Sequence, residues 1–177
     1  MNKKELRAWI REKKRNMTPQ QIESASRRLG QLLVETDLYQ KADTIYGYLP
    51  YNQEVRTVPM LEQAMKEGKR VAVPKCYGDE MRFIYMDDLS KVEKGYANIP
   101  EPIADEPVAD DKTALVLLPG MAFTKDGKRM GYGGGFYDKF FAAEPNHPPV
   151  ALCYDFQMVE DLPTEDYDIP VDCVLWA

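Results

Sequence analysis

Short apolar runs alternate with amphipathic segments along this chain of 177 residues. Runs of about four to six residues rich in aliphatic and aromatic side chains predict strands, because they suit a buried or half-buried pleated surface. The expected strands lie at 44–49, 70–73, 81–85, 114–118, 149–153 and 173–176. Pro74 should end the second strand, because proline cannot donate a hydrogen bond to a neighbouring strand.

Four segments with apolar residues three or four positions apart predict helices. They cover 3–16, a stretch beginning at Pro19, 58–66 and 136–143. The second helix has the strongest start, with Thr18 as the N-cap, proline at the first helical position and Gln21 completing a capping box. Gly68 is suited to end the third helix.

The order of these elements predicts an α/β fold with a mostly parallel sheet sandwiched by helices. Residues 95–112 are rich in Pro, Glu and Asp and are expected to form a loop across the surface. No internal repeat or long linker divides the chain, so we expect a single domain over 1–177.

Composition narrows the function classes. The net charge of −6 disfavours general nucleic-acid binding. No apolar run approaches the roughly 20 residues that a membrane span needs, and the charged start does not resemble a signal peptide, so a cytoplasmic location is expected. Three widely spaced cysteines argue against a zinc site or a disulfide framework. The only histidine, His147, lies between prolines and is a poor candidate for nucleophilic catalysis.

The charge is unevenly placed, because residues 1–16 carry +5 and the remainder −11. Lys3, Arg7, Arg11 and Arg15 recur every four residues and so form one basic stripe on the first predicted helix. Two interpretations stay open. A charge run is typical of a solvated face, and this one also suits a clamp for the phosphates of ATP.

A glycine-rich loop follows the predicted strand 114–118 and leads into the helix 136–143. Gly131, Gly133, Gly134 and Gly135 fall within five residues, so backbone N–H groups could converge on an anion there, beside a helix N-terminus. The loop is neither a Walker A motif nor a dinucleotide fingerprint, and a flexible turn without a ligand is the alternative. The nearby cations, which suit phosphate contacts, are Lys125, Lys128 and Arg129.

Two carboxylates are candidates for holding Mg²⁺ beside bound phosphates. Asp138 follows the glycine loop by three residues, where it is equally suited to be a first-turn acid favoured by the helix dipole. Asp168 lies in an acidic stretch near the end of the chain.

Four motifs together carry a resemblance that covers nearly the whole chain. They are Lys3-Lys-Glu-Leu-Arg7, Tyr48-Leu-Pro-Tyr-Asn-Gln-Glu-Val55, Val71-Ala-Val-Pro-Lys75 and the block from Pro119 to Asp138 that ends Arg129-Met-Gly-Tyr-Gly-Gly-Gly-Phe-Tyr-Asp138. On these motifs the chain resembles the 5-formyltetrahydrofolate cyclo-ligases, also called 5,10-methenyltetrahydrofolate synthetases. The last block is the most specific of the four.

The resemblance implies a fold and a reaction. The fold is the α/β type shared with sugar-phosphate isomerases and CoA transferases. The reaction is the ATP- and Mg²⁺-dependent closure of 5-formyltetrahydrofolate to 5,10-methenyltetrahydrofolate, with release of ADP and phosphate and a phosphorylated formyl intermediate. The implied partners are these small molecules, with no nucleic acid or membrane, and the expected state is a monomer or weak homodimer.

The resemblance also assigns roles to residues of this chain. The ATP-binding set is Lys3, Lys4, Arg7, Arg129, Gly131, Tyr132, Gly133, Gly134, Gly135, Phe136 and Tyr137. The folate-binding set is Tyr51, Glu54, Tyr132, Gly133, Gly134, Gly135 and Phe136. Arg129 and Lys125 are the expected catalytic residues, and Asp138 and Asp168 the expected Mg²⁺ ligands.

The sequence departs from the usual family pattern at a few positions. Tyr167 stands where the family usually has histidine, and Phe136 and Lys139 replace a tyrosine and an arginine. The aspartates are present, so the Mg²⁺ assignment is kept. Two other functions stay open: an isomerase or CoA-transferase relative that needs no ATP, and a module that binds ATP or folate without turnover.

Overall fold

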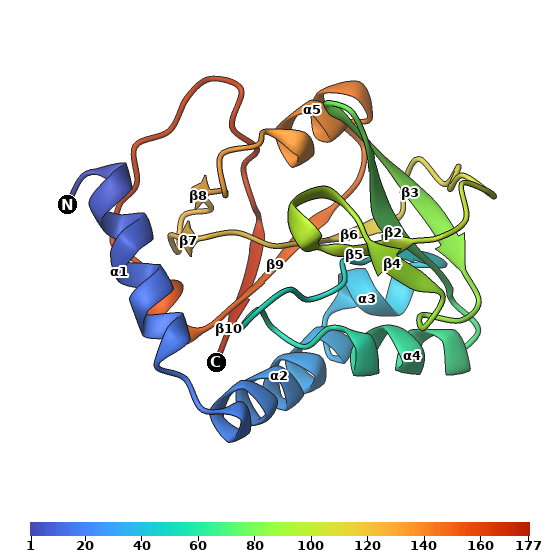
Figure 1. Cartoon of the computed structure of the whole chain (residues 1–177), viewed down its shortest axis with the longest axis horizontal. Helices are drawn as coiled ribbons and strands as arrows, with labels where there is room; N and C mark the ends of the chain where they lie inside the picture. Colours follow the sequence, from blue (N-terminus) through green and yellow to red (C-terminus); the bar gives the residue numbers. More distant parts are fainter.

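The computed structural model describes all of residues 1–177 and contains one six-stranded sheet (Figure 1). Its strands lie in the order β10-β9-β6-β1-β2-β3, and every neighbouring pair is parallel except β2 and β3. Their bounds are β1 Thr44–Tyr46, β2 Arg70–Tyr77, β3 Glu80–Met86, β6 Leu115–Leu118, β9 Pro149–Cys153 and β10 Cys173–Trp176. The expected α/β fold with a mostly parallel sheet is confirmed.

Helices cover both faces of this sheet, with α2 and α4 below it and α5 above it in Figure 1. The helices are α1 Lys3–Arg15, α2 Pro19–Val34, α3 Asp37–Lys41, α4 Val58–Lys66 and α5 Phe136–Ala143, with single 3-10 turns η1 Tyr96–Asn98 and η2 Asp155–Gln157. In β6, Leu115 and Leu117 pack toward α2, α3 and α4, whereas Val116 and Leu118 pack toward α5. This alternation follows from the two-residue period of a strand and explains why β6 is apolar throughout.

The predicted helices match the structure closely because their end signals are local. The Thr18 side chain accepts a hydrogen bond from the Gln21 amide, and the Gln21 side chain accepts one from the Thr18 amide. This confirms the capping box at the start of α2. The expected bounds 58–66 and 136–143 are those of α4 and α5.

Two predicted strand ends are wrong. The strand expected at 44–49 ends at Tyr46, and β2 continues through Pro74 to Tyr77. The Gly47 amide donates to the Ala72 carbonyl, so the backbone polar groups of Ala72, and two residues later of Pro74, face the β1 side of the strand. β1 ends opposite Ala72. The N–H that Pro74 lacks would therefore have no partner strand, and β2 tolerates the proline.

Two short two-stranded sheets were not expected. Residues 95–112 are more than a surface loop, because β4 Val92–Lys94 pairs with β5 Pro100–Pro102 around η1. A second hairpin pairs β7 Ala122–Phe123 with β8 Arg129–Met130. Strands of two or three residues are too short to produce a hydrophobic period that a sequence could reveal.

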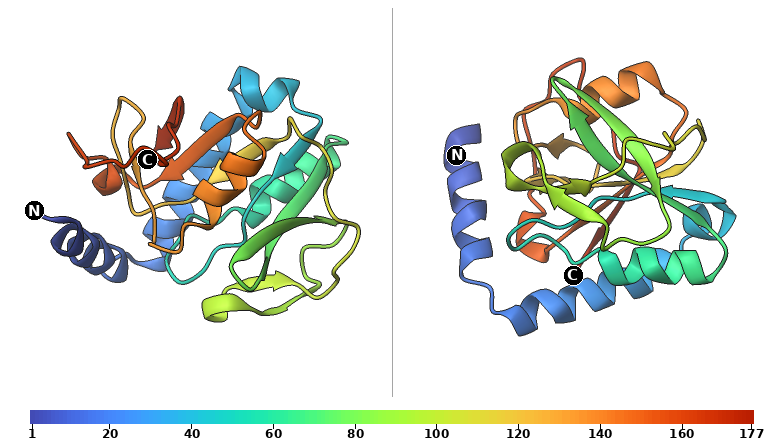
Figure 2. Two further views of the ribbon diagram at one scale, coloured as in Figure 1. Left: turned by 90° about the horizontal axis from the view of Figure 1, so that it is seen from above. Right: turned by 45° about the vertical axis from the view of Figure 1, so that its right-hand side comes forward.

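Helix α1 lies outside the sheet layers, along one side of the molecule in both views of Figure 2. It is held by a separate apolar cluster, in which Ile10 is fully buried. The partners of Ile10 there are Met121, Ala122, Met130 and Leu162. The β7–β8 hairpin therefore serves as the platform on which α1 is fixed. None of the helices is both long enough and apolar enough to cross a membrane.

The neighbouring strands β1 and β6 are followed by connections that run to opposite sides of the sheet. β1 leads through α4 to β2 on one side, and β6 leads through α5 to β9 on the other. In open α/β sheets a crevice forms at the carboxyl ends of strands at such a switch point. The loops that follow β1 and β6 are therefore the place to look for a site.

We predict that Ile10→Ala lowers the free energy of unfolding by about 2–5 kcal/mol, because it leaves a cavity in the cluster that fixes α1. Chemical denaturation measures this. Glu12→Ala, at an exposed position on the same helix, is the control. Equal stability of the two variants would contradict the docking of α1 through Ile10.

Candidate active site

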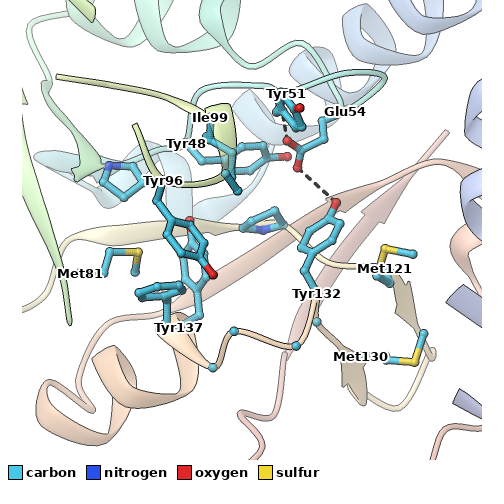
Figure 3. Close-up of a pocket in the computed structure, with 18 of the residues that line it drawn as sticks. Tyr48, Tyr51, Glu54, Met81, Tyr96, Ile99, Met121, Met130, Tyr132 and Tyr137 are labelled. Carbon is cyan, nitrogen blue, oxygen red and sulfur yellow. Dashed lines mark hydrogen bonds between the residues drawn. The ribbon is translucent and has the colours of Figure 1, made fainter. Parts of the chain in front are cut away.

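A cavity of about 770 Å³ opens at the carboxyl ends of the parallel strands. Its walls come from α1, the loop 48–54 after β1, the ends of β2 and β3, residues 96–101 and the glycine loop 131–135 (Figure 3). This volume lies within the range of small-molecule sites. The cavity therefore unites segments from the whole length of the chain.

The glycine loop forms one end of this cavity. The amides of Gly133, Gly134 and Gly135 donate no hydrogen bond to any protein group. Gly133 and Gly135 have φ of +106° and +70°, a backbone region that side-chain-bearing residues rarely adopt. The loop ends at the N-terminus of α5, which adds positive potential. Unpaired N–H groups beside a helix start suit an anion such as phosphate.

Arg129 is fixed beside this loop. Its Nε donates to the Pro119 carbonyl at 2.9 Å, and its two terminal nitrogens have no protein partner. A Cβ on Gly120 would lie 3.2 Å from Nε, and one on Gly131 would lie 3.2 Å from both terminal nitrogens. These glycines make room for the guanidinium. Burial lowers the pKa of Arg129, but an arginine remains charged in proteins, so it presents a cation with free donors to the cavity.

The basic stripe on α1 faces the cavity, because Lys3, Arg7, Arg11 and Arg15 all line it. A terminal nitrogen of Arg7 also lies 3.5 Å from the Gly131 carbonyl. The stripe thus borders the cavity, with Lys3 and Arg7 partly buried and Arg11 and Arg15 exposed to solvent. Arg7 therefore lies beside Arg129 and the free amide donors of the glycine loop, which gives this end of the cavity a positive character.

Asp138 and Asp168 both line the same end. Burial raises the pKa of Asp138, and the negative charge of Asp168 raises it further, against the opposing effects of Arg129 and of a hydrogen bond from the Ile169 amide. Asp168 Oδ2 also accepts a hydrogen bond from the Glu165 amide at 2.6 Å. The two carboxylates are thus close enough for their charges to interact, at the end of the cavity that is suited to phosphate.

Glu54 marks the other end of the cavity. Its Oε1 accepts a hydrogen bond from the Tyr51 amide at 2.8 Å, and its Oε2 accepts one from the Tyr132 hydroxyl at 3.2 Å (Figure 3). The surrounding turn is fixed by Arg56, whose Nη1 donates to the Asn52 carbonyl. Burial raises the pKa of Glu54, although the Tyr51 amide and Lys14 oppose the shift.

Apolar and aromatic side chains line the space between the two ends, and most were not expected from the sequence. They include Tyr48, Met81, Tyr96, Ile99, Met121, Phe136 and Tyr137. Tyr96 and Phe136 meet edge to face with ring centroids 5.1 Å apart. Tyr96 and Ile99 come from the segment interpreted as a surface loop. The sequence pattern there gave no sign that it turns back over the site.

Another unexpected residue is Lys14, which is 8% exposed and also lines the cavity. Its Nζ donates to the Tyr132 hydroxyl at 3.2 Å. A signal was available, because Lys14 stands four residues after the buried Ile10 and seven after Arg7, between the buried and basic sides of α1.

The structure does not bring Lys125 to the cavity. Lys125 is exposed in the turn of the β7–β8 hairpin, because the tight turn between these short strands projects its side chain into solvent. Lys128 pairs with Asp161 at 2.5 Å instead of facing the loop. Lys4 is exposed on α1 outside the cavity wall. The expected catalytic role of Lys125 is therefore withdrawn, because its side chain does not line the cavity. Lys4 also does not line the cavity.

His147 lies away from the cavity, where its Nδ1 is 2.8 Å from the Ala114 carbonyl and its ring packs on Tyr46 and Phe140. These contacts agree with a structural role for this histidine.

With this geometry in view, comparison with known proteins identifies the family. The 5-formyltetrahydrofolate cyclo-ligase family model matches residues 1–177. The chain belongs to this family. Two curated cyclo-ligases of similar length match this family member along most of the chain. The protein of Escherichia coli strain K12 is 29% identical over 173 residues, covering 94% of this chain and 95% of the relative. The protein of Mus musculus is 27% identical and covers 98% and 93%.

Solved structures of related proteins have the same fold as this cyclo-ligase family member. The NMR structure of Aquifex aeolicus 5,10-methenyltetrahydrofolate synthetase superposes with a TM-score of 0.85 at 28% identity, covering 99% of this chain and 90% of that one. A synthetase from Mycoplasma pneumoniae has a TM-score of 0.78 and covers 98% of both chains. At 22% identity it supports the fold alone.

We predict a pH-dependent difference in stability between the wild-type cyclo-ligase family member and Glu54→Gln. Because the pKa of Glu54 is raised in the folded state, the wild type binds a proton more tightly when folded. It should lose stability relative to the glutamine variant as pH rises from about 4.3, the ordinary glutamate pKa, through the raised value, and the difference should be constant above it. Denaturation curves at a series of pH values test this. A constant difference throughout would show that the carboxylate is not desolvated.

Proposed function

We propose that this protein closes 5-formyltetrahydrofolate to 5,10-methenyltetrahydrofolate, with conversion of ATP to ADP and phosphate. The observation that carries the proposal is one cavity with two chemically different ends. One end has unpaired loop amides, Arg129 and the first cations of α1, Lys3 and Arg7, and the other has the oriented Glu54 carboxylate. Family membership supplies the reaction class.

The positive end suits the triphosphate of ATP. The free amides of the glycine loop would donate hydrogen bonds to phosphate oxygens, and Arg129 would face the γ-phosphate with its two free terminal nitrogens. Lys3 and Arg7 on α1 would close over the phosphates from the opposite wall. In phosphoryl transfer most of the catalysis comes from such positioning and charge stabilisation.

The Glu54 end suits the reduced pterin. A pterin edge carries several N–H donors, and an ionised carboxylate is an acceptor with two oxygens. Each Glu54 oxygen has one protein donor, which leaves acceptor capacity on both for the ligand. Aromatic rings of Tyr48 and Tyr137 line the space between this carboxylate and the phosphate end, where flat ring systems pack well.

These two ends allow a route without a covalent enzyme intermediate. The formyl oxygen, made nucleophilic by the N5 lone pair, attacks the γ-phosphorus and ADP leaves. N10 then attacks the carbon of the resulting imidate phosphate, loses its proton, and phosphate leaves with the former formyl oxygen. Arg129 would stabilise the charge that develops on the transferred phosphoryl group. This route requires no side chain of the protein to act as a nucleophile.

The acids at the phosphate end fit a Mg²⁺ ion. Mg²⁺ in nucleotide sites is held by one or two carboxylates together with phosphate oxygens and water. Asp138 and Asp168 supply such a pair, and no cluster of three potential ligands that would suggest a dedicated protein cage is present. When bound, the ion would neutralise phosphate charge beside Arg129.

The direct test is the absorbance of the methenyl-folate band after purified protein is mixed with 5-formyltetrahydrofolate and Mg-ATP. We expect a rise that requires ATP and is matched by release of phosphate. A flat trace from folded protein that still binds ATP or folate by calorimetry would favour a binding module. A reaction that proceeds without ATP would contradict the proposal.

We predict that Arg129→Ala lowers turnover at least about tenfold, because a preorganised charged donor to the transition state is removed. The matched control is Lys125→Met, which removes a cation from the same hairpin outside the cavity and should leave turnover near the wild-type value. Steady-state kinetics measure both. Near-normal turnover of Arg129→Ala would remove Arg129 from the mechanism.

We predict that Asp138→Ala raises the Mg²⁺ concentration for half-maximal rate at least about tenfold, since changes around metal ligands commonly have effects of that size. Asp161→Asn, which alters an exposed acid paired with Lys128, is the control. Titrations of the rate and of nucleotide binding with Mg²⁺ measure the effect. Superimposable titrations for Asp138→Ala and wild type would reject the metal assignment.

A further inference from the structure

Three polar side chains from separate segments form a chain across the folate end of the cavity. Lys14 of α1 donates from Nζ to the Tyr132 hydroxyl at 3.2 Å, and that hydroxyl donates to Glu54 Oε2 at 3.2 Å. Figure 3 shows the Tyr132 hydroxyl directed at the Glu54 carboxylate. The ammonium of Lys14 also lies 5.5 Å from the centroid of the Tyr132 ring. The glycine loop, α1 and the 51–54 turn are thus joined through one tyrosine.

The position of Lys14 is unfavourable for a residue that serves stability alone. Its side chain is buried, yet no carboxylate lies within ion-pair distance of Nζ. Burial lowers the pKa of Lys14, and the charge of Glu54 is the largest opposing influence. A buried ammonium carries a desolvation penalty that a single neutral hydrogen-bond partner does not offset. This arrangement suggests a functional reason for the lysine.

Glu54 is the group that benefits from this arrangement. The Tyr51 amide fixes Oε1 and the Tyr132 hydroxyl fixes Oε2, so the plane of the carboxylate is set from both sides. The other cation near Glu54 is Arg56, which uses Nη1 to bind the Asn52 carbonyl. The remaining ionisable neighbours of Glu54 are tyrosine phenols, namely Tyr48, Tyr132, Tyr137 and Tyr154.

Lys14 also polarises the hydroxyl that contacts Glu54. A hydroxyl that accepts from an ammonium becomes a better donor, because hydrogen bonds in a chain strengthen one another in a poorly solvated site. The charge of Lys14 therefore strengthens the hydrogen bond from the Tyr132 hydroxyl to Glu54, although Lys14 and Glu54 are not in direct contact.

We propose that Lys14 is a positioning residue for the folate substrate, which holds the Glu54 carboxylate in its binding orientation through the Tyr132 hydroxyl. This inference rests on the proposed function and adds to it a residue on α1 that determines affinity for the reduced folate. Lys3, on the same helix, is 11 residues away, about 16 Å along a helical axis. Lys14 should therefore act on folate binding and not on the phosphate end.

The test compares Lys14→Met, Tyr132→Phe and the double variant with wild type. Methionine keeps a linear side chain of similar size, and phenylalanine removes only the hydroxyl. We expect each single variant to raise the KM for 5-formyltetrahydrofolate roughly tenfold, as for loss of a hydrogen bond to a charged group, while kcat and the KM for ATP change less than about threefold. Lys13→Met, an exposed neighbour on α1, is the control and should match wild type.

Non-additivity distinguishes positioning from general packing. In the Tyr132→Phe background, Lys14→Met should change the folate KM by less than about twofold, because the connecting hydroxyl is already absent. Full additivity, an unchanged folate KM in folded Lys14→Met, or an equal loss in kcat and ATP affinity would each overturn the proposal. If Lys14→Met does not fold, Tyr132→Phe alone must still raise the folate KM.

Failure of the proposed function gives a different result. If wild-type protein forms no methenyl product, the dissociation constant for 5-formyltetrahydrofolate, measured by calorimetry, replaces KM, and the same ratios among the variants are expected. Equal dissociation constants would overturn the positioning role alone. A wild type that binds no reduced folate would overturn both proposals.

Discussion

The site depends on holding the guanidinium of Arg129 in the wall of the cavity. Such a cation is tolerated only where its donors and charge find partners. The Pro119 carbonyl satisfies Nε, Asp138 and Asp168 supply opposing charge, and Gly120 and Gly131 leave the necessary space. The two terminal nitrogens have no protein partner. The fold therefore fixes a cation whose two terminal nitrogens are available to the phosphate of the proposed ATP substrate.

The topology of the sheet explains why the two ends of the cavity face each other. The loop carrying Glu54 follows β1, and the segment carrying Arg129 and the glycine loop follows β6, which is the immediate neighbour of β1. Helix α1, fixed by Ile10 on the β7–β8 hairpin, lines the same cavity. Substrate groups that must react would thus be brought together by loops that follow adjacent strands.

Much of this arrangement follows from local patterns in the sequence. Capping residues such as Thr18 and Gln21 set the helix start, and the apolar runs set the strands, so the α/β class could be predicted. The glycine loop could be recognised because its backbone conformation demands glycine at positions 133 and 135. Lys14 and Tyr96 could not be recognised with equal ease, because their roles come from packing between segments far apart in the chain. Lys125 was misplaced for the same reason: its charge and sequence proximity to Arg129 do not reveal the turn that directs it outward.

Hydrogen exchange with each ligand alone is the most direct test of the central claim that one cavity holds two substrates at opposite ends. A non-hydrolysable ATP analogue with Mg²⁺ should protect the amides of 131–138 and leave those of 51–54 nearly unchanged. 5-Formyltetrahydrofolate alone should protect 51–54 most strongly. Protection of both segments by ATP alone, with none from the folate, would show that the Glu54 end belongs to the nucleotide site and would contradict the account.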